Sequence, residues 1–238
     1  MTFIWYKNNA AIPNATLSSY TTPPTTIAND GDQFIVTVGN SFGSATSPAA
    51  QLTVNPTQAV DVVTYHNDHP RTGQNLTEAL LMPGNVTSAT FGKLKQFPVD
   101  GRVDAQSLDL SNVAIPNKGT HNVLYVVTEH DSVYAFDATT GARLWSKGLL
   151  GAGETPSDPR SCDQVTPEIG ITSTPVIDRG LGAMYVVAMS KNASGNYFQR
   201  LHALDITTGN EMFSGPTTIT ATYPGTGDNS SGQNVVFD

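Results

Sequence analysis

The sequence predicts an all-β protein, and three observations support this prediction. The 238-residue chain is only 13% charged, and its many Thr, Ser, Asn and Gly residues suit short strands joined by turns. The segment Val123–Ser146 contains a β-branched run, a polar turn, an alternating run and a turn that ends in glycine, which is a strand pattern. The same pattern returns once, in Ala183–Ser214.

The two segments match position by position. Tyr125–Val127 corresponds to Tyr185–Val187 at an offset of 60 residues, and a longer hairpin loop, Ser190–Asn196, then raises the offset to 68. Four residues of the following turn are identical at that offset: Ala135, Asp137, Thr140 and Gly141 correspond to Ala203, Asp205, Thr208 and Gly209. A repeat of four strands with a period of 60 to 70 residues predicts β-propeller blades.

The run Ala135–Gly141, followed by Trp145, resembles the A-x-D-x-x-T-G-x-x-x-W repeat of propellers of the pyrroloquinoline quinone (PQQ) type. In such a turn the Asp and Thr side chains are expected to bond backbone N–H groups, and the Trp is expected to pack against a neighbouring blade. Phe213 stands where the second copy should have Trp. The packing of the second copy against its neighbouring blade should therefore be weaker, or another side chain should fill the place of the Trp. His202 aligns with Tyr134, which predicts a packing residue.

Residues 1–56 form a separate predicted module with strands in Phe3–Asn8, Gln33–Gly39 and Ala50–Val54. The module resembles the later part of an immunoglobulin-like domain, with Trp5 as its core tryptophan. Its first two strands are absent from the sequence, so we expect a partial β-sandwich.

Residues 57–101 are predicted to be a linker, a lead-in segment and a ring-closing strand. Lys93–Gly101 resembles Arg143–Gly151, the outer strand of the first blade, so we expect Lys93–Val99 to complete a last blade and to lie unpaired here. The lead-in segment holds His66, Asp68 and His69, but their spacing fits no zinc pattern and a fourth ligand is missing. A hydrogen-bonded loop is therefore predicted there.

Residues 102–238 are predicted to hold two to three four-stranded blades of an incomplete propeller, so the chain is interpreted as a fragment. Two loops should open on one face of these blades, Gly148–Gly170 and Ser190–Asn196, and loop variation on one face of a repeat protein indicates a binding surface. The first loop carries four acids against Arg160: Glu154, Asp158, Asp163 and Glu168. This acidic loop face is predicted to bind a protein or carbohydrate ligand, with a solvated loop as the alternative.

Charge and composition exclude several classes of function. The net charge of −8 argues against a nucleic-acid or anionic-membrane surface. No apolar run approaches the length of a membrane span, and Met1–Tyr6 lacks the features of a signal peptide. Cys162 is single, so it forms no disulfide within this sequence. No Gly-x-Ser-x-Gly elbow of a hydrolase is present.

Two functions remain. The first is a non-catalytic binding or scaffold protein, secreted or on the cell surface, with the bacterial periplasm as an alternative location. The second, implied by the resemblance, is a quinoprotein dehydrogenase that oxidises an alcohol or sugar with PQQ and calcium. Enzymes of that family use adjacent cysteines, a catalytic Asp and Glu/Asn calcium ligands, and Cys162 between Ser161 and Asp163 does not match them. No catalytic, cofactor-binding or metal-binding residue is therefore predicted.

Overall fold

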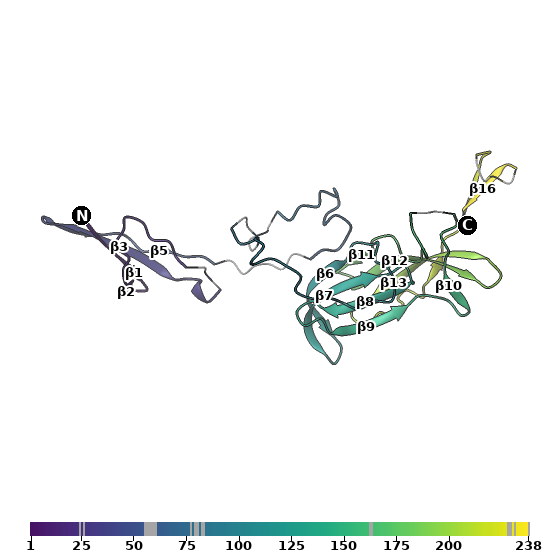
Figure 1. Cartoon of the computed structure of the whole chain (residues 1–238), viewed down its shortest axis with the longest axis horizontal. Helices are drawn as coiled ribbons and strands as arrows, with labels where there is room; N and C mark the ends of the chain where they lie inside the picture. Colours follow the sequence, from purple (N-terminus) through teal and green to yellow (C-terminus); the bar gives the residue numbers. More distant parts are fainter. Residues whose placement is uncertain are drawn as a thin grey trace. The chain divides into compact units, whose positions relative to one another are not determined.

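The computed structural model describes residues 1–23, 25, 27–54, 61–76, 78, 81, 84–161, 164–227, 230 and 232–237. Apart from one short 3-10 helix, η1 (Ile27–Asn29), every regular element in this part of the chain is a β-strand, which confirms the all-β prediction. The chain divides into two compact units, Met1–Gln58 and Ala59–Asp238 (Figure 1). Among the described residues, no helix has the length and apolar character needed to cross a bilayer.

The first unit is one antiparallel sheet in the order β2-β1-β3-β4, with β5 paired to the other end of β3. Its strands are β1 (Thr2–Lys7), β2 (Ala10–Ala11), β3 (Gln33–Asn40), β4 (Gly43–Thr46) and β5 (Ala50–Gln51). Trp5, Tyr20 and Phe34 form an aromatic row with centroid separations of 6.0 and 6.1 Å, and the Trp5 indole donates to the Leu17 carbonyl at 3.0 Å. This sheet corresponds to one layer of the predicted partial sandwich.

The second unit contains two repeat sheets. The first repeat sheet has the order β6-β7-β8-β9, and the second has the order β11-β12-β13-β14, with β10 added beside the far end of β12. The strands of the first are β6 (Leu108–Ile115), β7 (Gly119–Val127), β8 (Ser132–Asp137) and β9 (Arg143–Gly148). Those of the second are β11 (Val176–Asp178), β12 (Ala183–Asn192), β13 (Tyr197–Asp205) and β14 (Thr217–Thr218), with β10 at Glu154–Pro156. A separate hairpin follows, β15 (Ala221–Pro224) with β16 (Asn234–Phe237).

The sequence repeat is also a repeat of strand register. Tyr125 lies opposite Ala135 in the first sheet, and Tyr185 lies opposite Ala203 in the second. The turn after each of these pairs closes in the same way. The N–H of Gly141 bonds the Asp137 carbonyl at 2.8 Å, and Gly209 bonds the Asp205 carbonyl at the same distance.

The Asp side chains of these turns act as the motif predicts. The Asp137 carboxylate accepts from the Thr140 N–H at 2.5 Å, and Asp205 accepts from the Thr208 N–H at 3.1 Å. Both turn glycines have positive φ, 82° at Gly141 and 72° at Gly209, a region that L side chains disfavour.

The main hydrophobic core lies between the two repeat sheets and draws residues from both. Two aromatic side chains of the first sheet bond one carbonyl of the second, because the Tyr125 hydroxyl and the Trp145 indole donate to Ile206 O at 2.9 and 3.1 Å. The half-buried Trp145 ring also lies against Gly209. The expected Trp contact is therefore present, whereas Phe213, its counterpart, is 63% exposed.

Lys93–Val99, which was predicted to be a strand, has no regular secondary structure and pairs with no strand of the described part of the chain. The segment is nevertheless not detached from the sheet. Phe97 and Val99 pack on a second apolar cluster, and the Phe97 ring lies 5.2 Å from that of Phe136. This segment therefore covers the face of the first repeat sheet that is turned away from the second.

Candidate functional site

The two loops predicted to share one face do lie together. Residues Glu154–Pro156 of the first loop form β10, which pairs antiparallel with Ser190–Asn192 at the start of the second loop. The pairing brings Glu154 to the end of the second repeat sheet, next to the strand that carries Arg200.

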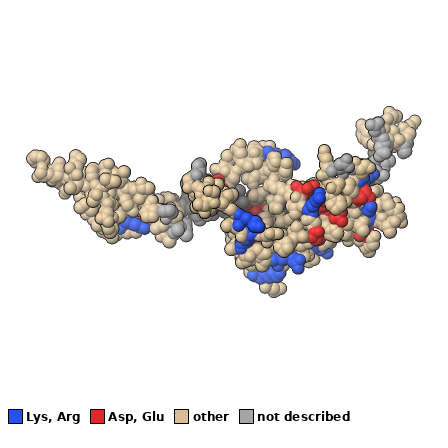
Figure 2. Space-filling model, in the orientation of Figure 1, with Lys and Arg blue, Asp and Glu red and all other residues tan. Residues whose placement is uncertain are grey.

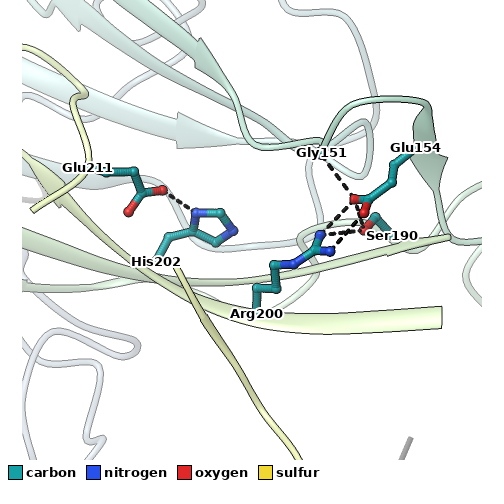
Figure 3. A network of polar contacts seen from close by, with 6 residues as sticks. All are labelled: Gly151, Glu154, Ser190, Arg200, His202 and Glu211. Carbon is teal, nitrogen blue, oxygen red and sulfur yellow. Dashed lines mark hydrogen bonds and ion pairs between the residues drawn. The ribbon is translucent and has the colours of Figure 1, made fainter. Parts of the chain in front are cut away.

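Glu154 is the centre of a partly buried polar network, shown in Figure 3. Its carboxylate accepts two hydrogen bonds of 2.7 Å from the Arg200 guanidinium, one of 2.7 Å from the Ser190 hydroxyl and one of 3.0 Å from the Gly151 N–H. Hydrogen bonding to Arg200 lowers the pKa of Glu154 to about 2. The carboxylate is thus fully occupied, and its role is to join β10 and the loop to β13.

The other described acids of the acidic loop face are also paired. Asp158 accepts from Lys191 and from the Tyr197 hydroxyl, and the first of these bonds lowers its pKa. Glu168 pairs with His130 at 2.9 Å. Asp163 and Cys162 lie outside the described residues. Acidic and basic residues are interspersed over the visible face of the second unit (Figure 2), so this face is not uniformly negative.

His202 and Glu211 form a second polar pair on the same strand face as Arg200 (Figure 3). His202 is only 2% exposed, as a packing residue should be, but its Nδ1 bonds the Glu211 carboxylate, a contact that the sequence did not predict. Its Nε2 atom and the Glu211 Oε2 atom are buried and have no hydrogen-bond partner. In Figure 3 the second ring nitrogen lies on the side of the ring that faces Arg200.

A cavity of about 270 Å³ opens beside this pair, between the end of the first repeat sheet and β13. Its walls are formed by Lys147, Gly148, Leu149, Leu150, Gly151, Arg200, His202, Glu211 and Pro216. Buried polar atoms are normally paired, so two buried polar atoms without a partner, in residues that line one cavity, are unusual. This cavity is the candidate functional site.

Asp131 is a further buried acid at the junction of the repeat sheets. It is 1% exposed, and neither carboxylate oxygen accepts a well-formed hydrogen bond. Burial, with added repulsion from Glu168 and Glu154, raises the pKa of Asp131 to about 7 although His130 opposes the shift. The group therefore makes the stability of this junction sensitive to pH.

The lead-in segment is a hydrogen-bonded loop, as predicted. The His66 ring stacks on Tyr65 at 3.9 Å, and its Nδ1 lies 3.1 Å from the Arg71 carbonyl. Asp68 accepts from the Thr72 N–H at 2.8 Å. Among the described residues, no three His, Cys, Asp or Glu side chains are grouped to hold a metal ion.

The residues of the candidate site stand where the two repeats differ. Arg200, His202 and Glu211 occupy the positions of Ser132, Tyr134 and Arg143 in the first copy. Alignment of the two copies therefore shows three changes to polar or charged residues, two of them on β13 and the third at Glu211, which forms an isolated bridge with Leu204. The sequence alone does not show that these three residues line one cavity, because that depends on how the fold brings them together.

No known family model matches the chain, and no curated protein is significantly similar to it. What the chain does must therefore be inferred from its own contacts and from the repeat motif.

Proposed function

We propose that this chain is a non-catalytic binding or scaffold module of a secreted or cell-surface protein. It would combine repeats of the PQQ-like propeller type with an immunoglobulin-like module at the N-terminus. The observation that supports this proposal most is that the polar groups of the repeat motif are hydrogen-bonded within the fold. Tyr125 and Trp145 both donate to Ile206 O. The Asp137 and Asp205 carboxylates each accept a backbone N–H that closes their turn.

The charged side chains of the second unit support the same proposal. Glu154 with Arg200 and Asp61 with Arg179 are ion pairs that hold separate strands and loops together. Arg179 also donates to the Ser111 carbonyl at 2.7 Å, and Asp61 accepts from the Ser111 N–H at 2.8 Å. Groups that are committed to such contacts stabilise a scaffold, whereas reactive groups converge on one point that a substrate can reach.

The test compares the two functions that the sequence allows. The full chain is incubated with PQQ and Ca²⁺, and the reduction of an artificial electron acceptor is followed with primary alcohols and aldoses as substrates. In parallel, the chain is applied to an array of immobilised glycans. We expect no PQQ-dependent reduction and saturable retention on at least one glycan. Reduction that depends on PQQ would refute the proposal in favour of a quinoprotein dehydrogenase.

A further inference from the structure

The face of the second repeat sheet that is turned away from the first is apolar and partly exposed. Alternate residues of β12 and β13 lie in the core between the sheets, so the residues between them point to the other side. With the β11 residue that pairs with Tyr185, they define the outer face, which comprises Val176, Tyr185, Val187, Leu201 and Ala203. Val176 is 46% exposed and Leu201 is 40% exposed. Exposed apolar residues that adjoin on one sheet face indicate an interaction site.

The first repeat sheet shows what such a face binds. The residues equivalent to the outer face, at the repeat offsets of 60 and 68, are Leu108, Tyr125, Val127, Val133 and Ala135. None of them is more than 2% exposed, because they belong to the core that the first sheet shares with the second. Their cross-strand pairing is also the same, since Leu108 lies opposite Tyr125 as Val176 lies opposite Tyr185. The partner that fits the outer face is therefore a sheet like the one that the first sheet already binds.

The polar part of the existing junction has an unpaired counterpart at each end of the repeat. Across the junction, the Tyr125 hydroxyl donates to Ile206 O at 2.9 Å. Tyr185, the equivalent of Tyr125, is half-buried, and its hydroxyl has no hydrogen-bond partner in the described part of the chain. Ala138 occupies the position of Ile206 in the turn of the first repeat, and no described residue donates to its carbonyl. A donor on one sheet and an acceptor on the other are thus available for the same bond.

The first repeat sheet has a receiving side equivalent to the surface that the second sheet presents to it, formed by Val126, Tyr134 and Phe136. The segment Lys93–Val99 covers this side, mainly through Phe97 and Val99. Phe97 and Lys95 lie against Gly141 in the turn, and Lys95 donates to a carbonyl of that turn. The other residues of the segment are exposed and none pairs with a described strand. The segment therefore covers the side with a few side chains and no sheet.

We propose that the outer face of the second repeat sheet docks on the receiving side of a second copy of the chain, in place of that copy's segment Lys93–Val99. The contact between copies repeats the junction within the chain, with the Tyr185 hydroxyl donating to Ala138 O. Because each copy carries one outer face and one receiving side, the contact is heterologous and builds a ring or an open row of copies. This assembly goes beyond the proposed binding function and does not depend on which ligand is bound.

Sedimentation velocity of the full chain from about 1 to 100 µM tests the association. The sedimentation coefficient should rise reversibly with concentration. Leu201→Glu and Val176→Glu place a charge on the outer face, and each should weaken association about tenfold or more. The control is Leu181→Glu, because Leu181 is 57% exposed but lies in the turn before β12, and this variant should associate like the unchanged chain. A chain that stays monomeric, or equal association of all three variants, would refute the inference.

The covering segment gives a change in the opposite direction. Phe97→Ala removes the main contact that docking has to displace, so this variant should associate about tenfold more tightly. The double variant Phe97→Ala/Leu201→Glu should lose that gain. If the double variant associates as strongly as Phe97→Ala, the loosened sheet aggregates by another route and the inference is wrong.

A mixing experiment identifies both surfaces. Ala138→Glu places a charge on the receiving side, where the equivalent Ile206 is buried in the existing junction. Neither Ala138→Glu nor Leu201→Glu should associate alone, but an equimolar mixture should form a 1:1 pair, because each variant keeps the surface that the other lacks. If Ala138→Glu alone still dimerises and Leu201→Glu does not, the outer faces bind each other and the proposed partner surface is wrong.

Discussion

Gly209→Ala should destabilise the second unit much more than Gly141→Ala, although the two glycines occupy the same position of the repeat. Their φ angles are similar, 72° and 82°. A Cβ atom on Gly209 would lie 2.7 Å from Trp145 Cε3, closer than real contacts allow, whereas on Gly141 the nearest atom would be Lys95 Cδ at 3.7 Å. The comparison therefore isolates the contact between the Trp145 ring and the neighbouring sheet.

The magnitude follows from two separate costs. Alanine in the left-handed region costs about 1–2 kcal/mol at either position. Only Gly209→Ala also displaces Trp145, and overpacking of this kind costs about 1–3 kcal/mol. We therefore expect the free energy of unfolding to fall by about 1–2 kcal/mol in Gly141→Ala and by about 2–5 kcal/mol in Gly209→Ala.

The assay is urea unfolding of the full chain in a Trp5→Phe background. Because the chain has two tryptophans, the remaining fluorescence reports on Trp145 and hence on the second unit. The same two alanine variants are then compared in Trp145→Leu by circular dichroism, where the difference between them should disappear. Equal destabilisation in the first comparison, or a difference that persists without Trp145, would contradict the inter-sheet contact.

Three further predictions concern other parts of the second unit. Hydrogen bonding to Arg200 lowers the pKa of Glu154 from 4.5 to about 2, so the contribution of Glu154 to stability is present above pH 4.5 and is lost as the pH falls towards 2. In Glu154→Gln the urea midpoint should therefore depend less on pH over that range, and an unchanged pH profile would argue against the ion pair. Burial raises the pKa of Asp131 from 3.8 to about 7, so stability should fall as the pH rises between these values. Asp131→Asn should remove this fall, and at a pH above 7 its urea midpoint should be higher than that of the unchanged chain; a lower midpoint at that pH would contradict the prediction. Phe97→Ala should cost about 1–3 kcal/mol, less than a fully buried Phe, and should speed amide exchange at Tyr134 and Phe136; unaltered exchange would show that the segment does not protect the sheet.

The features that the sequence predicted correctly depend on local interactions. The turns at Asp137 and Asp205 are each closed within five residues, so their residue types and spacing are sufficient to predict them. Trp145 could be placed because it belongs to the same motif. The shared location of the two loops followed from the alternation of strands in a repeat.

The candidate site could not be predicted in the same way, because its contacts join distant parts of the chain. Glu154 and Arg200 are 46 residues apart, and composition suggested an acidic loop where the fold forms ion pairs. His202 was expected to pack, and its burial agrees with that. Its polar partner Glu211 lies across a turn, beyond the alternation that predicts a strand face.

The carbonyl of Ile206 joins the repeat sheets through a main-chain atom, so this link is separate from the packing of side chains. Tyr125 and Trp145 together use its two lone pairs, and the acceptor belongs to the main chain. Substitution of the Ile206 side chain leaves that oxygen in place, so the two hydrogen bonds themselves do not depend on the residue type at position 206. The residue type there is constrained by packing instead, because the Ile206 side chain is buried in the core that the two sheets share.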